Sequence, residues 1–157
     1  MGDFMGKYEE KILKLSQKAA KYNCVPVGAL IVDKNGEIIA EGFNKKEITN
    51  NPLDHAEIIA IKKATKKNKS WKLNQCSLYV TMKPCAMCNC VINETRIKNV
   101  FYFVENKKEE YKNKRGINSI KFEQIKSEKL QDKYLSILRN FFSEKRKKTR
   151  KIDNNVI

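Results

Sequence analysis

The sequence of 157 residues has no apolar run near the ~20 residues that cross a bilayer. It also lacks the apolar segment that a signal peptide carries near its start. It contains no internal repeat, no Pro- or Ser-rich linker and no low-complexity block. These absences predict an unprocessed cytoplasmic protein without a membrane partner. Its length predicts one domain over residues 1–150, with 151–157 as a flexible tail.

Histidine is nearly absent, because the only one is His55. Cysteine occurs five times, an odd number in a chain without an export signal, and disulfides are rare in the cytosol. Clustered thiols in such a chain indicate a metal or catalytic site. Cys24 and Cys76 lie in apolar, strand-like surroundings, so we expect them to be buried and inert.

Acidic residues are few beside basic ones, and the formal net charge is +15. Lys and Arg neutralise phosphates, so the charge favours a nucleic-acid partner. However, 28 of the 33 basic residues are Lys, which a compositional bias of the coding sequence would also produce. Local clustering is more informative, because seven basic residues and one acidic residue lie between Arg139 and Lys151, around Phe141 and Phe142. This pattern suits a single-stranded RNA loop, and a solvated helix end is the alternative.

The hydrophobic pattern predicts the element order αββαβαββα. We expect helices over residues 4–22, 55–66, 85–94 and from about 127, and strands over 25–33, 37–43, 76–82, 99–104 and 120–125. Asn35-Gly36 predicts a type I′ hairpin turn, and residues 45–54 and 105–118 read as loops. This order predicts an α/β protein with three αβα layers, in which a mixed five-stranded sheet has helices on both faces.

Two short motifs carry the chemistry: His55-Ala56-Glu57 and Pro84-Cys85-Ala86-Met87-Cys88. Each begins a predicted helix. Cys85 and Cys88 are three residues apart and therefore share one face of the first turn. A helix N-terminus favours negative charge, which stabilises the thiolate that zinc binds. One imidazole and two thiolates make three protein ligands and leave a fourth position for water, the arrangement of a catalytic zinc site.

Glu57 lies close to this site but is not expected to bind the metal, because His55 does so two residues earlier. Its carboxylate can take a proton from water and return it to a substrate nitrogen and a leaving amine, as hydrolytic deamination requires. Two alternatives stay open. The Cys-x-x-Cys pair alone fits a redox site, and a structural zinc site with Cys90 or Cys76 as its fourth ligand is the main competitor.

The motifs resemble the cytidine and deoxycytidylate deaminase superfamily, most closely its TadA-type tRNA-specific adenosine deaminases. The resemblance runs from about Tyr8 to Lys148 and includes, beside the two motifs, Val25-Pro26-Val27-Gly28-Ala29, Gly42-Phe43-Asn44, Leu78-Tyr79-Val80-Thr81 and Phe141-Phe142. It implies a cytidine-deaminase-like fold, one Zn²⁺ per subunit, a homodimer, and conversion of adenosine to inosine at the wobble position (34) of the tRNA anticodon stem-loop.

The same resemblance assigns roles to single residues. It implies His55, Cys85 and Cys88 as zinc ligands and Glu57 as the proton donor. It further implies that the following residues contact the substrate: Asn44, Ala56, Val27 and Phe142. Lys83 stands where the family usually has Glu, and residues 105–114 lack its Gly/Ala-rich loop. A deaminase of a free nucleobase or nucleotide (guanine, cytidine or dCMP) and an inactive RNA-binding relative therefore remain alternatives.

Overall fold

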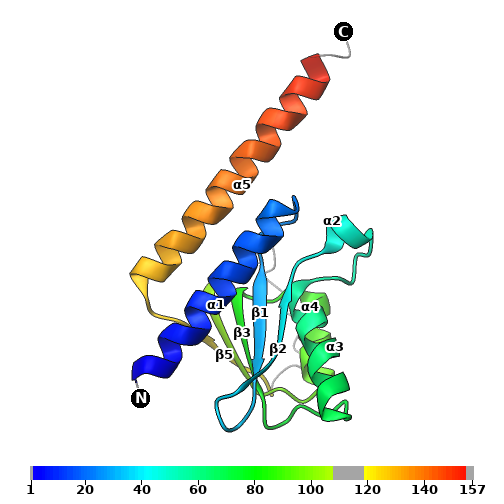
Figure 1. Cartoon of the computed structure of the whole chain (residues 1–157), viewed down its shortest axis with the longest axis vertical. Helices are drawn as coiled ribbons and strands as arrows, with labels where there is room; N and C mark the ends of the chain where they lie inside the picture. Colours follow the sequence, from blue (N-terminus) through cyan, green and yellow to red (C-terminus); the bar gives the residue numbers. More distant parts are fainter. Residues whose placement is uncertain (1, 108–118, 155–157) are drawn as a thin grey trace.

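One mixed sheet organises the fold (Figure 1). The structure, a computed structural model, describes residues 2–107 and 119–154. In spatial order the strands are β2 (Ile38–Phe43), β1 (Gly28–Val32), β3 (Ser77–Met82), β4 (Asn99–Val104) and β5 (Lys121–Gln124). β1 pairs antiparallel with β2 and β3, whereas β3 with β4 and β4 with β5 are parallel. The predicted mixed five-stranded sheet is confirmed.

Helices cover both faces of this sheet (Figure 1). One face carries α1 (Gly2–Lys21) and α5 (Glu128–Asn154), and the other carries α3 (Ala56–Asn68) and α4 (Ala86–Glu94). Side chains alternate along β1, so Ala29 and Ile31 join the core under α3 and α4 while Leu30 joins the core under α1 and α5. The predicted three-layer αβα architecture is confirmed. None of the helices in the described part of the chain is long and apolar enough to span a membrane.

The hairpin turn differs from its prediction. A type I′ turn needs positive φ at both central residues, but only Gly36 has it, with φ +81°. The side chain of Asp33 explains the difference, because its Oδ1 accepts hydrogen bonds from the backbone N–H groups of Asn35 (2.9 Å) and Glu37 (3.0 Å). The result is a three-residue loop closed by Gly36, and the type I′ prediction was wrong.

Other boundaries also shift. The first strand begins at Gly28 rather than Val25. The carbonyl oxygens of residues 25–27 accept hydrogen bonds from Asn44 and Tyr134 and therefore do not pair with β3. The short helix α2 (Lys46–Thr49) lies in the predicted loop 45–54. Residues 151–154 of the predicted tail belong to α5, and residues 155–157 lie outside the described residues.

Several chain segments meet at one end of the sheet. β1 begins there and β2 and β3 end there, since Gly28 is paired with Phe43 and Ala29 with Val80. α3 and α4 also begin at this end, directly after His55 and Cys85. Gly42 allows α3 to approach, because a Cβ on Gly42 would lie 2.4 Å from the Ala56 carbonyl oxygen and 2.9 Å from the Ala60 nitrogen. Both chemical motifs are therefore brought to the same place.

Candidate active site

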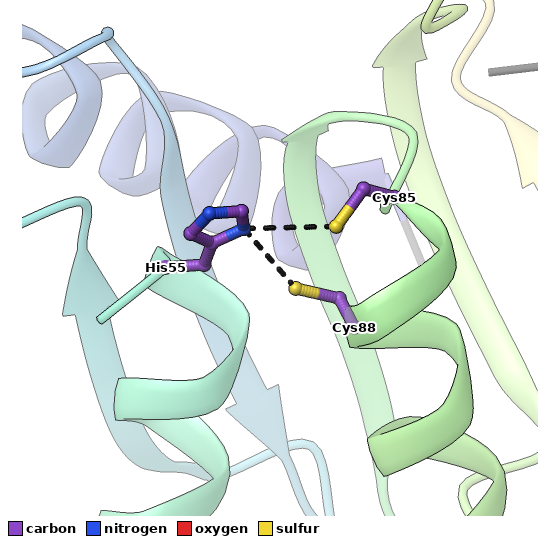
Figure 2. A group of neighbouring side chains, drawn as sticks. All are labelled: His55, Cys85 and Cys88. Carbon is purple, nitrogen blue, oxygen red and sulfur yellow. Dashed lines mark hydrogen bonds between the residues drawn. The ribbon is translucent and has the colours of Figure 1, made fainter. Parts of the chain in front are cut away.

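Three potential metal ligands face one another at this end of the sheet (Figure 2). His55 directly precedes α3, Cys85 directly precedes α4, and Cys88 lies in the first turn of α4. His55 Nδ1 is 3.7 Å from Cys85 Sγ and 3.5 Å from Cys88 Sγ. The ligand atoms of all three residues lie within 4.8 Å of one another. The structure thus brings together the residues that the sequence predicted as ligands, and they could hold a metal ion.

The two nitrogen–sulfur distances fit a tetrahedral zinc ion. Zinc binds imidazole nitrogen at about 2.0 Å and thiolate sulfur at about 2.3 Å, so ligand atoms on one tetrahedral ion lie roughly 3.5–3.8 Å apart. Within the described residues, neither alternative cysteine joins this group. Cys90 is exposed, and Cys76 lies at the opposite end of β3 from Cys85. A set of one His and two Cys leaves a coordination position open, as in catalytic zinc sites.

The electrostatics of the cluster favour a thiolate at Cys85. A hydrogen bond with the Cys88 side chain is the largest cause that lowers the pKa of Cys85, to about 4. The same hydrogen bond, followed by burial, raises the pKa of Cys88. The side-chain hydrogen bond with Cys85 raises the pKa of His55. The pair therefore favours one thiolate, the form of cysteine that binds metals.

Glu57 is buried beside the three ligands, with 4% of its surface exposed. Burial is the largest cause that raises its pKa, to about 7, and a backbone hydrogen bond and the nearby His55 act in the opposite direction. Such a carboxyl group can accept and release a proton near neutral pH. The position of Glu57 follows from that of His55, since both belong to the beginning of α3.

A cavity of about 190 Å³ opens onto this group, and His55, Glu57 and Cys85 are in its wall. Three of the predicted substrate contacts, Asn44, Ala56 and Val27, also line it. The Asn44 side chain is held in place: its Nδ2 donates to the Val25 carbonyl (3.2 Å), and its Oδ1 accepts from the Lys46 backbone N–H (3.1 Å).

Phe142, the fourth predicted contact, does not line the cavity. It lies exposed on α5, beside a groove that shares Val25, Met82 and Asn106 with the cavity. Its predicted role at an anticodon loop stays a prediction. Most of the predicted charged loop, residues 108–118, lies outside the described residues.

The structure also adds residues to the cavity wall that the motifs did not indicate as functional, among them Lys46, Met82 and Lys83. Lys83 forms an ion pair with Glu105 (3.2 Å), which also accepts a hydrogen bond from the Tyr102 hydroxyl. Lys83 directly precedes Pro84, so its place next to the motif was a usable signal. Lys46 carries no such signal, because α2 within the 45–54 segment positions it.

The fold and the site together define a class. The sheet lies between two layers of helices. His-x-Glu begins one helix, and Pro-Cys-x-x-Cys begins the next. This is the layout of the zinc-dependent base deaminases. The chain belongs to the MafB19-like deaminase family, whose sequence profile matches residues 5–146. The resemblance inferred from the motifs is confirmed at this level.

Individual relatives show the same likeness. A tRNA-specific adenosine deaminase of Rickettsia bellii (strain RML369-C) is 47% identical over 91 residues, which are 57% of this chain and 63% of the relative. The match therefore spans less than two thirds of that relative's length.

Two solved structures are also similar. One comes from studies of A-to-I editing by tRNA:A34 deaminases at the wobble position of transfer RNA; its TM-score is 0.72 at 26% identity, over 77% of this chain and 98% of that one. The other is a guanine deaminase from Bacillus subtilis, with a TM-score of 0.61 at 37% identity, over 67% of this chain and 66% of that one.

Proposed function

We propose that this protein is a zinc-dependent hydrolytic deaminase that converts adenosine to inosine at position 34 of a tRNA. The observation that carries the proposal is the meeting of His55, Cys85 and Cys88 with buried Glu57 at one cavity. We infer that the first three hold one Zn²⁺ per subunit. Zinc bound there would lower the pKa of water and so supply the nucleophile at neutral pH.

The residues of the chain perform the remaining steps. Hydrolysis adds the oxygen of water to the purine carbon that carries the exocyclic amine, and ammonia leaves. Glu57 takes the proton from the attacking water and delivers protons to the ring nitrogen and to the departing amine. Asn44, the backbone of Ala56 and Val27 orient the base, because they line the same cavity and an amide can both donate to and accept from a purine edge.

A tRNA substrate is supported by the relatives' names and by charge. The Rickettsia relative is a tRNA-specific adenosine deaminase, and one similar fold comes from tRNA:A34 deaminases. Residues 146–153 of α5 are all exposed, and this stretch and Lys145 carry six of the seven basic residues of the cluster seen in the sequence. Cations next to exposed Phe142 suit a single-stranded loop, whose phosphates need neutralising and whose bases stack. We further infer a homodimer, as the resemblance implies.

Deamination of free guanine is the second candidate. It is favoured by the 37% identity to the guanine deaminase of Bacillus subtilis. Both candidates use the same zinc and the same Glu57, so they differ only in what enters the cavity.

One assay distinguishes the two candidates. The protein is incubated with a transcribed tRNA that carries adenosine at position 34, and in parallel with free adenosine, guanine, cytidine and dCMP. We expect inosine at position 34 and no change at other adenosines, read by nucleoside analysis and by the A-to-G change after reverse transcription. A tRNA with guanosine at position 34 is the matched control. Conversion of guanine with an unchanged tRNA would replace the proposal by the second candidate.

A further inference from the structure

We propose that Tyr134 is a positioning residue of the active site: from α5 it fixes the wall segment Val25–Val27, and through that segment the side chain of Asn44. The inference deepens the proposed function and rests on it, since Asn44 is proposed there to orient the base. Tyr134 itself lines neither the cavity nor the metal group.

Tyr134 is anchored in the core. Its side chain is fully buried, and the centroid of its ring lies 6.3 Å from the ring centroid of Phe103 in β4. Its hydroxyl donates a 2.7 Å hydrogen bond to the carbonyl of Pro26, 108 residues earlier in the chain. Burial raises the pKa of Tyr134, so the phenol keeps its proton and remains the donor. A bond of this kind between two buried groups is maintained, because a buried carbonyl without a partner is costly.

The accepting segment needs such an anchor because it lies outside the sheet. β1 starts only at Gly28, so Val25, Pro26 and Val27 precede its ladder. Next to them, the Gly28 N–H donates to the hydroxyl of buried Thr81 (3.2 Å). The segment is thus fixed on one side by α5 and on the other by β3.

The segment in turn holds Asn44. Asn44 Nδ2 donates to the Val25 carbonyl, and the Asn44 backbone N–H donates to the Val27 carbonyl (3.0 Å). The two carbonyls that bind Asn44 therefore flank the one that binds Tyr134. Val25 and Val27 also form part of the cavity wall. A shift of Pro26 would move both the wall and the amide that faces the substrate.

The test compares two variants that lose the same kind of hydrogen bond. Tyr134→Phe removes the bond to Pro26 together with the side-chain hydrogen bond to Thr81. Tyr8→Phe removes the partly buried bond from the Tyr8 hydroxyl to the Gly36 carbonyl in the hairpin turn, at the opposite end of β1 from the cavity. We expect Tyr134→Phe to lower kcat/KM by about 10-fold, mainly through KM, because it disturbs a contact made in the ground state and the transition state alike. Tyr8→Phe should retain the wild-type constants, and both variants should retain bound zinc.

Two further variants complete the design: Asn44→Ala, for a double-mutant cycle, and Thr81→Val, which removes the hydroxyl that accepts from Gly28 and that also hydrogen-bonds Tyr134. In the Asn44→Ala background Tyr134→Phe should have no further effect, and Thr81→Val should reproduce the rise in KM. Wild-type kinetics in both Tyr134→Phe and Thr81→Val, or an equal loss in the Tyr134→Phe and Tyr8→Phe variants, would overturn the proposal.

A measurement that needs no substrate separates this inference from the proposed function. The Asn44 side-chain amide signal in a ¹⁵N NMR spectrum should shift in Tyr134→Phe, while that of Asn51, which bonds Asp54 (3.3 Å), should not. If the wild-type protein leaves tRNA unmodified, the proposed function fails, and the amide signal still decides the role of Tyr134. An unmoved Asn44 signal overturns it.

Discussion

Glu57 illustrates how one residue acquires a role from its place on a helix. It lies two positions after His55, and α3 starts between them, so the carboxyl group is carried into the cavity while the imidazole faces the two sulfurs. Glu57 makes few contacts with water, because only 4% of its surface is exposed. A carboxyl group in such a position is suited to proton transfer rather than to holding the fold together.

Replacement of this carboxyl group gives the first prediction. Glu57→Gln should reduce kcat by roughly 10²–10⁴-fold, because the amide cannot shuttle protons. Metal analysis of protein purified without added zinc should give about one zinc per chain in both wild type and variant, since the three ligands are unchanged. Glu47→Gln, an exposed change in the neighbouring α2, is the matched control and should behave as wild type. Substantial deamination by Glu57→Gln would contradict the proposed mechanism.

Local sequence carried the information for the ligands but not for their supports. His55, Cys85 and Cys88 were identifiable as candidate ligands because zinc sites restrict both residue type and spacing. Tyr134 was only one apolar position on a helix face, since its bond to Pro26 depends on how α5 crosses the sheet. Phe142 was given a substrate contact by the resemblance, and it lines the groove that adjoins the cavity, so this role stays a prediction.

Among the elements, those with a regular hydrophobic period were predicted well, and those shaped by side-chain hydrogen bonds were not. The fourth strand has the predicted bounds, Asn99–Val104, and α3 differs by at most two residues at either end. The hairpin turn failed because Asp33 caps it, and the start of β1 failed because Asn44 and Tyr134 take the carbonyls of residues 25–27. The bonds of Asn44 and Tyr134 join residues far apart in sequence, whereas those of Asp33 are local, and neither kind leaves a periodic signal.

The contact between β2 and α3 yields the second prediction. Gly42→Ala should destabilise the protein by about 1–3 kcal/mol, the usual range for overpacking, because its Cβ would collide with the backbone at Ala56 and Ala60. The first turn of α3 should move away from β2, so zinc affinity should fall as well. Thermal unfolding and zinc titration measure the two effects.

Gly6→Ala supplies the control for this experiment, because nothing lies within 4 Å of a Cβ added at Gly6 in α1. It should leave zinc affinity unchanged and should not lower stability. Equal zinc affinity in Gly42→Ala and wild type would show that α3 does not need this close approach to place His55.

Across the molecule, the C-terminal basic cluster and the metal group lie on different elements. The metal group and its cavity lie where α3 and α4 begin, whereas the basic cluster lies on the last turns of α5, which in Figure 1 extends beyond the other elements. Removal of the helix end should therefore affect RNA binding without affecting the site.

A truncation after Phe142 tests this separation. It removes six cations: Lys145, Arg146, Lys147, Lys148, Arg150 and Lys151. Affinity for an anticodon stem-loop falls with salt at a log–log slope of about −0.7 to −0.9 per phosphate contacted. The slope should become shallower by several units in the truncated protein, with unchanged zinc content. Equal affinity and equal slope in both proteins would assign the cluster to solvated surface.

The helical form of this cluster has a consequence for recognition. Successive residues of an α-helix point about 100° apart, so six cations between Lys145 and Lys151 are distributed around the whole circumference of α5 rather than along one stripe. A rod charged on all sides attracts a polyanion in almost any rotational setting, and contacts to phosphates carry no base information. For the proposed tRNA substrate, α5 would therefore contribute capture without selectivity, and recognition of the target base would fall to the cavity.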